Sequence, residues 1–172
     1  MKGNKLAAIA AIGALGLFAA GSYGGTNDKA KAASGIEQLV PLVGEWEGTT
    51  DGGGSVKLTY TLVSNGTALM ERMQPSNEPD MLTMYSADGD HILVTHYCSA
   101  GNQPQMQSAA ITGPTQKFDF SLIRVTGLKK ADDGHMIQLV LTLVDKDHLT
   151  EEWTYVENGK RQTEKFQYSR KS

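Results

Sequence analysis

Two residues that could do chemistry, His96 and Cys98, lie two positions apart in the segment 91–98. An imidazole and a thiol can act together as base and nucleophile, and with a methionine sulfur they can bind copper. The even-numbered residues of this segment, which include Ile92 and Val94, form its more apolar set, so we expect them to face the interior. The spacing leaves simpler alternatives open, namely a structural buried histidine and a cysteine that packs as a small apolar residue.

A carboxylate accompanies an aromatic residue in a later segment. Glu151 has the same parity as Trp153 in the alternating stretch 149–155, so both side chains face inward unless a bulge turns Glu151 to solvent. An interior carboxylate and an interior imidazole would orient an amphipathic molecule in an otherwise apolar pocket. The other residues expected to line that pocket are apolar or aromatic: Met84, Met106, Tyr60, Phe118 and Phe120, with either Met70 or Met73.

The residues favour binding over catalysis. No third residue can be assigned to orient His96 against Cys98. The sequence also lacks a paired-histidine motif, a phosphate loop and a G-x-S-x-G elbow. We therefore assign no catalytic residue and predict no cofactor, with His96 as the candidate ligand if haem or copper binds.

The elements that must position these residues are strands, because apolar and polar residues alternate from Trp46 onward. No helical segment is long enough to connect parallel strands, so the strands must be antiparallel. Closure into an up-and-down barrel removes both sheet edges, whereas a sandwich would need longer crossing connections. About ten strands are expected, the first from residue 46, then 56–62, 69–73, 81–85, 91–98, 105–111, 117–122, 136–144, 149–155 and one around 166–168.

Turn residues separate these strands. Asn65-Gly66 and Asn158-Gly159 each predict a two-residue hairpin, because both positions need positive φ. Gly101 to Pro104 predicts a loop that could form a barrel rim. Before the first strand, 36–40 has helical spacing and predicts a short helical turn that Pro41 ends.

The N-terminal residues follow the pattern of a secretory signal peptide. Lys2 and Lys5 precede an apolar run over 6–18, and Ala19-Ala20-Gly21 provides a cleavage site. A membrane-spanning helix would need roughly 20 apolar residues. The sequence thus predicts a signal peptide over 1–21, a flexible linker over 22–35 and a β-barrel domain over 36–172. It also predicts export to the periplasm or medium, without stable membrane insertion after cleavage.

Composition excludes several classes of function. The chain has 172 residues, of which 40% are hydrophobic and 20% charged, as expected for one globular domain. A formal net charge of −3 provides no general footprint for nucleic acid. A single cysteine excludes an intramolecular disulfide and a cysteine-rich zinc site.

The segment Gly44-Glu45-Trp46-Glu47-Gly48 resembles the first-strand G-x-W motif of the calycin superfamily, which includes lipocalins, fatty-acid-binding proteins and nitrobindins. The resemblance implies that Trp46 closes the base of a barrel and that a late-strand arginine, here Arg170, lies across it. Such a cation over an indole stabilises by about 0.5–2 kcal/mol. The alternative is an ordinary core tryptophan and a solvated Arg170.

A second stretch, Asp88-Gly89-Asp90 followed by 93–98 and 101–106, resembles uncharacterised exported bacterial proteins of lipocalin-like type. The likeness over 36–170 implies a barrel with an interior cavity, and the expected function is binding of a small hydrophobic or amphipathic molecule. One alternative is a haem- or metal-dependent redox protein of nitrobindin-like type. Nitrobindins bind haem through a histidine near the C-terminal end, where this chain has only His148 beside a turn, although His96 could substitute. Another alternative is a packed barrel that acts through its surface.

Overall fold

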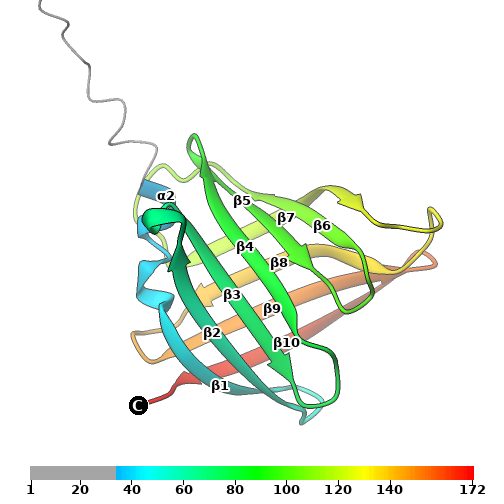
Figure 1. The fold of residues 1–172 in the computed structure, drawn as a ribbon, viewed down its shortest axis with the longest axis horizontal. Helices are drawn as coiled ribbons and strands as arrows, with labels where there is room; N and C mark the ends of the chain where they lie inside the picture. The colour runs from blue at the N-terminus through cyan, green and yellow to red at the C-terminus, as the bar shows by residue number, and fades with distance from the viewer. Residues whose placement is uncertain (1–33) are drawn as a thin grey trace, which may run out of the picture.

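The alternating segments form ten antiparallel strands in the computed structural model, which describes residues 34–172. Each strand pairs with the next along the chain, and the first pairs with the last, so the sheet closes into a barrel (Figure 1). The prediction of an all-β up-and-down barrel is therefore confirmed. The strands are β1 Gly44–Thr50, β2 Ser55–Val63, β3 Ala68–Pro75, β4 Met81–Asp88, β5 His91–Tyr97, β6 Gln103–Ser108, β7 Lys117–Thr126, β8 His135–Leu143, β9 His148–Glu157 and β10 Lys160–Arg170.

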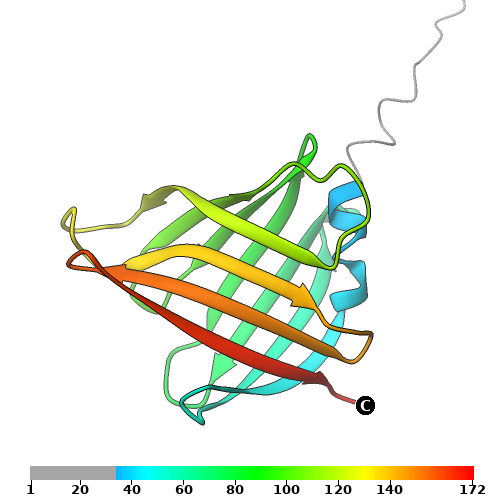
Figure 2. The ribbon, with the colours of Figure 1, turned by 180° about the vertical axis from the view of Figure 1, so that it is seen from behind.

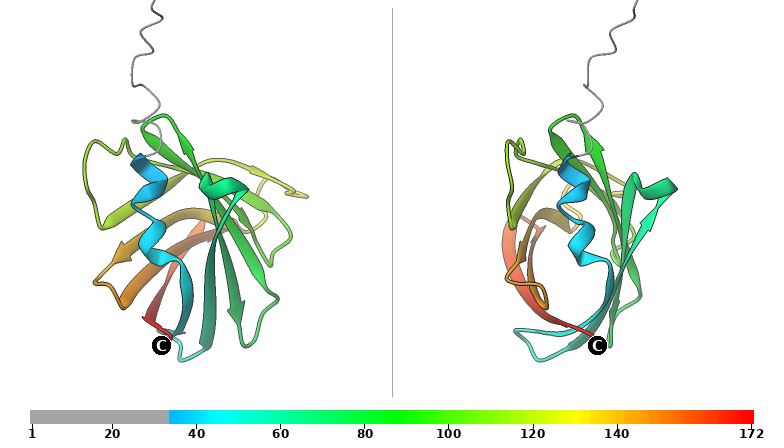
Figure 3. Two further views of the ribbon diagram at one scale, coloured as in Figure 1. Left: turned by 60° about the vertical axis from the view of Figure 1, so that its left-hand side comes forward. Right: turned by 90° about the vertical axis from the view of Figure 1, so that its left-hand side faces the viewer.

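A short helical segment precedes the barrel and covers one of its ends (Figure 3). It consists of α2 Ser34–Glu37 and the 3-10 turn η1 Val40–Leu42. Pro41 lies inside η1 instead of ending the helical turn, because a proline is tolerated in the first turn of a helix. Leu39 and Leu42 are fully buried, so the apolar side chains of this segment close one end of the barrel.

The signal peptide expected over 1–21 and the first twelve residues, 22–33, of the linker expected over 22–35 lie outside the described residues, and α2 begins at Ser34. No helix in the described part of the chain is long and apolar enough to cross a membrane.

The two Asn-Gly turns differ in the structure. Asn158 and Gly159 have φ of 49° and 73° between the paired residues Glu157 and Lys160, which confirms the two-residue hairpin. The other turn is longer than expected: β2 and β3 pair up to Val63 and Ala68, so four residues connect them. Three of these four, including Asn65, have positive φ and form η2 Ser64–Gly66. The prediction of a two-residue turn at Asn65-Gly66 is therefore wrong.

Strand β6 is shifted toward the N-terminus relative to the expected 105–111. The connection runs over 98–102, earlier than the expected 101–104, and is held by hydrogen bonds from the Gly101 N–H to the Cys98 carbonyl and from the Cys98 N–H to the Asn102 carbonyl. Pro104 belongs to β6 but lies beyond the last residue paired with β5, which is Gln105. A proline is tolerated there because no hydrogen bond of the β5–β6 ladder depends on its missing N–H.

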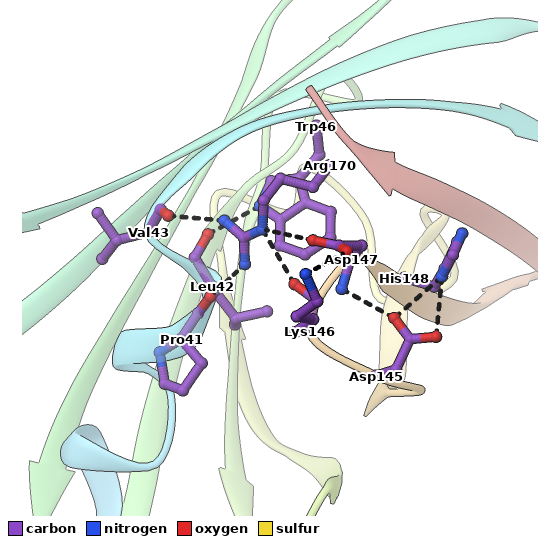
Figure 4. Close-up of polar contacts among 9 residues, drawn as sticks. All are labelled: Pro41, Leu42, Val43, Trp46, Asp145, Lys146, Asp147, His148 and Arg170. Atoms are coloured by element: carbon purple, nitrogen blue, oxygen red, sulfur yellow. Dashed lines mark hydrogen bonds and ion pairs between the residues drawn. The ribbon is translucent and has the colours of Figure 1, made fainter. Parts of the chain in front are cut away.

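The covered end of the barrel is held by the expected pair of Trp46 and Arg170 (Figure 4). These residues are directly paired across β1 and β10, and the guanidinium carbon lies 4.0 Å from the indole centroid. Arg170 also donates hydrogen bonds to the carbonyls of Pro41, Val43 and Lys146. The indole N–H donates to the Leu42 carbonyl at 2.8 Å. The pair thus joins both ends of the barrel sheet to η1 and to the β8–β9 turn.

Gly48 in the same first strand has a steric role. A Cβ atom at this position would collide with the Gln167 carbonyl and with the ring of Tyr168 on β10. The final glycine of the G-x-W-x-G pattern therefore permits β1 and the β10 aromatics to pack closely where the barrel closes.

Candidate functional site

The barrel differs at its two ends. The end covered by α2 and η1 is filled by packed side chains, whereas the opposite end carries five hairpin connections, β1–β2, β3–β4, β5–β6, β7–β8 and β9–β10 (Figure 2). A cavity of about 1180 Å³ opens among these connections and extends into the barrel. Its apolar wall is formed by side chains from five strands: Met73, Met81, Met136, Trp153 and Phe166.

His96 lines this cavity from the end of β5, and its ring is 1% exposed. The ring centroid lies 4.5 Å from that of Trp153, so the two rings are in contact on the cavity wall. His96 Nδ1 lies 3.0 Å from the Thr83 hydroxyl, whereas Nε2 is buried and has no hydrogen-bond partner among the described residues. Burial lowers the pKa of His96 to about 4, so the imidazole is neutral at neutral pH.

Two fully buried carboxyl groups, Glu71 on β3 and Glu151 on β9, lie beneath the cavity. Glu71 accepts hydrogen bonds from the hydroxyls of Tyr85 at 2.6 Å and Thr83 at 3.1 Å. Glu151 accepts from Tyr60 at 2.5 Å and from the indole N–H of Trp153 at 3.1 Å. Neither carboxyl forms an ion pair with a cation in the part of the chain that the structure describes.

Burial raises the pKa of both carboxyl groups, and the nearby charge of Glu71 raises the pKa of Glu151 further. Two such groups cannot both ionise without a cation. The pair therefore retains a proton at a pH where an exposed glutamate has lost its own.

The Thr83 hydroxyl links Glu71 to His96. It has one proton and donates it to Glu71, so it accepts from Nδ1 of His96. The histidine then carries its proton on Nδ1, and its buried Nε2 has an unshared electron pair.

The structure brings four of the predicted pocket residues to the cavity, namely Met73, His96, Cys98 and Trp153. Glu151 lies behind Trp153, as its hydrogen bond to the indole shows. Tyr60 also points inward, but its hydroxyl donates a hydrogen bond to Glu151, and Tyr60 is not one of the residues that line the cavity. The remaining interior residues, Met106, Phe118 and Phe120, belong to the packed core, where Phe120 meets Tyr85 edge-on at 5.9 Å.

The inward orientation expected for Met84 is wrong. On β4 the buried residues are Met81, Thr83 and Tyr85, so Met84 faces outward and is paired with Met70 of β3. Both faces of β4 carry apolar residues, so alternation alone does not decide which face points inward. The inward face includes the polar residue Thr83, whose hydroxyl donates a hydrogen bond to the buried carboxyl group of Glu71. The interior methionine of β3 is Met73.

Cys98 lies one residue beyond β5, half-buried in the turn at the cavity mouth. Burial raises the pKa of its thiol, and His96, with its lowered pKa, is a weak base. A thiolate nucleophile activated by this histidine is therefore disfavoured. Residues 34–172 also contain no group of three His, Cys, Asp or Glu side chains arranged to hold a metal ion.

Sequence reasoning missed Glu71 and its partners Thr83 and Tyr85. Glu71 lies between two buried residues of the same parity, Leu69 and Met73. That alternation is the signal that could have placed it inside, just as parity placed Glu151.

Comparison with known proteins identifies a fold. No protein-family model matches the chain, and no curated protein matches it significantly. Among solved structures, it is similar to a protein of unknown function from the DUF3598 family of Nostoc punctiforme PCC 73102, with a TM-score of 0.54 and 14% identity. The match covers 80% of this chain and 49% of the other, so the chain spans about half the length of that protein. At this identity the likeness shows the fold alone, a closed antiparallel barrel that fits a calycin-like class.

Proposed function

We propose that this protein binds a small amphipathic molecule in the cavity at the open end of its barrel. The observation that carries the proposal is the cavity itself, in which apolar and aromatic side chains such as Met73, Trp153 and Phe166 lie beside polar ones such as Glu78 and Glu164. A wall with both kinds of surface is what an amphipathic ligand needs for burial and orientation.

The wall and the volume support the same function. A volume of about 1180 Å³ is slightly above the range of about 300–1,000 Å³ that is usual for small-molecule sites, so the cavity has room for such a ligand. The methionines Met73, Met81 and Met136 provide a flexible wall that can adapt to the ligand and admit it to the histidine.

The proposal includes export, for which the sequence of residues 1–21 is the support. The mature protein begins between residues 20 and 34, and an exported carrier or scavenger is the role that follows. N-terminal sequencing of the stable form tests this part. A stable form that starts at Met1 or Gly3 would contradict it.

Haem or copper binding is the second candidate, favoured by the free imidazole nitrogen of His96, which is an ordinary metal ligand. For haem, however, none of the described residues that line the cavity is a lysine or arginine that could meet the propionate groups. For copper, Cys98 would have to ionise against its raised pKa. These residues fit an organic ligand better than either group. A barrel that acts through its surface is the third candidate, supported by the packed core of the covered end.

Native mass spectrometry of protein purified from its own host distinguishes these candidates. A retained organic mass of a few hundred daltons supports the carrier function, and a haem or copper mass supports the second candidate. Titration with a fluorescent amphipathic probe should show binding by the wild type and weaker binding by His96→Ala. His148→Ala, at the covered end, is the matched control and should bind as the wild type does. No retained mass and no probe binding would favour the surface candidate.

A further inference from the structure

Strands β3, β4 and β5 carry apolar side chains on the outside of the barrel as well as on the inside. Their inward residues are buried, and the outward residues that alternate with them include five large apolar side chains: Met70, Leu82, Met84, Leu93 and Tyr97. None of the five is among the described residues that line the cavity. We call the surface that they form the outer apolar face, and it turns toward the viewer in Figure 1.

The register of the strands brings these five side chains together. Met70 is paired with Met84, Leu82 with Tyr97, and Leu93 with Ser86. Across β2–β5 the pairs form three successive outward rows, which are Thr59, Arg72, Leu82 and Tyr97; Thr61, Met70, Met84 and Thr95; and Val63, Ala68, Ser86 and Leu93. Successive rows on one face of a sheet are about 7 Å apart, so the five apolar side chains form one continuous patch.

The opposite side of the barrel is different. Outward side chains of β9 and β10 include the ion pair of Glu152 and Lys165, and beside them Lys171 is paired with Glu45 of β1. A sheet with one face in water normally has polar residues on that face. Contiguous exposed apolar surface of the kind that β3–β5 carry marks a site of interaction with another molecule.

From this arrangement we infer that the outer apolar face binds the same face of a second copy of the chain and forms a twofold symmetric dimer. Charge favours this partner. Arg72 is the charged residue of the three rows, and its guanidinium is paired with Asp80 at 2.6 Å, so the face has no net charge. The chain as a whole has a net charge of −3, so two copies repel each other least where they approach through this face.

The rows also fit one another about a twofold axis. With the axis along the middle row, the first row of one copy meets the third row of the other, so Tyr97 meets Leu93 and Leu82 meets Ser86. The first row projects furthest, because Leu82 is 38% exposed and Tyr97 is 49% exposed. The third row contains the small residue Ser86 and can accept them. Met70 and Met84 lie at the axis, where flexible side chains adapt to their own counterparts.

The area of the face is sufficient for a reversible dimer. Four strands about 4.8 Å apart and eight residues of about 3.3 Å each give a face of roughly 19 by 26 Å. Two copies would therefore cover about 1,000 Å² between them, the size at which specific interfaces begin. We expect a dimer that dissociates at micromolar concentrations, as is usual at the low end of this size range.

Sedimentation equilibrium of protein purified from its own host, over a range of micromolar concentrations, tests the inference. Twice the mass of the chain is expected at the upper concentrations. Met84→Glu places two carboxylates against each other at the axis and should raise the Kd of the dimer about a hundredfold. Ile123→Glu is the matched control, because Ile123 is an exposed apolar residue of β7, outside the outer apolar face, and its substitution should leave the Kd unchanged.

Cross-linking locates the contact without an added charge, and it serves if Met84→Glu does not fold. Packed sheets lie about 10 Å apart, whereas the Cα atoms of a disulfide are at most about 6.8 Å apart. A short bismaleimide should therefore join two copies of Met84→Cys in a Cys98→Ser background. Ile123→Cys in the same background should stay unlinked.

Each result has a distinct meaning. A single chain mass at every concentration overturns the inference. A dimer that Met84→Glu leaves unchanged and Met84→Cys does not cross-link also overturns it, because another surface then joins the copies. Binding of the monomer to neutral lipid vesicles, lost in Met84→Glu, would assign the face to a lipid surface instead. The proposed carrier function survives all three results, because the face and the cavity have no residue in common.

Discussion

Arg170 lies over the ring of Trp46, with its guanidinium carbon 4.0 Å from the indole centroid, at the point where the first and last strands of the barrel meet. The same guanidinium binds the carbonyls of Pro41 and Val43, which belong to the segment covering this end. Closure of the sheet and closure of the barrel end therefore depend on one pair of side chains. The opposite end has no such helical cover in the described chain and contains the cavity.

Replacing Trp46 by alanine should reduce the free energy of unfolding by about 3–5 kcal/mol, the usual cost of removing a large buried aromatic side chain. The indole is 2% exposed and also donates a hydrogen bond to Leu42. Urea denaturation provides the measurement. Tyr97→Ala, which removes a side chain that is 49% exposed, is the control and should change stability by less than about 0.5 kcal/mol. An unchanged midpoint for Trp46→Ala would mean that the indole does not support the fold.

Arg170→Lys should destabilise the protein by about 1–2 kcal/mol although the charge is kept. A lysine ammonium cannot lie flat on the indole and bind the carbonyls of Pro41, Val43 and Lys146 at the same time. Arg161→Lys on the same strand is the matched control, because Arg161 is exposed. Equal denaturation midpoints for the two variants would show that charge alone accounts for the role of Arg170.

Glu151→Gln should flatten the dependence of stability on pH. In the wild type, burial and the charge of Glu71 raise the pKa of Glu151, so the folded state binds more protons than the unfolded state once pH exceeds the ordinary glutamate pKa, about 4.3. Stability is therefore greatest below that pH and declines as pH rises through the folded-state pKa. Glutamine resembles the protonated acid and should remove much of this decline between pH 5 and 9.

The measurement is urea denaturation at several pH values, with Glu157→Gln as the exposed control on the same strand. Parallel stability curves for wild type and Glu151→Gln would show that Glu151 ionises as readily in the folded protein as in the unfolded one.

His96→Phe should change stability in a pH window below neutrality. Burial lowers the pKa of His96 to about 4 in the folded protein, against about 6.5 when unfolded. The unfolded state therefore binds more protons between these two values. The wild type should lose up to about 3 kcal/mol on this account as pH falls through the window, and the phenylalanine variant should not.

The comparison is the difference in unfolding free energy between wild type and variant at pH 7 and pH 4.5, with His148→Phe as the control. A difference that does not vary with pH would contradict the buried neutral imidazole.

Much of this architecture follows from local pattern. Alternation with period two, together with turn residues and the lack of a helix long enough for a crossover, predicts an antiparallel barrel, because only closure pairs both edge strands. Parity alone places His96, Glu151 and Trp153 inside. The resemblance of residues 44–48 to the G-x-W motif predicted the contact between Trp46 and Arg170 that the structure shows.

What the sequence by itself determined is therefore which residues face inward along most strands; the tertiary structure decided which inward residues meet. Glu71 and Glu151 are 80 positions apart on strands that are not neighbours, and they interact only across the barrel interior. The diameter of the barrel and the stagger of its strands set that meeting, and neither is a local property of the chain. Likewise, the choice between Met84 and Thr83 as the inward residue of β4 depends on a carboxyl group contributed by β3. The sequence of β4 alone does not decide which face points inward, because both of its faces carry apolar residues.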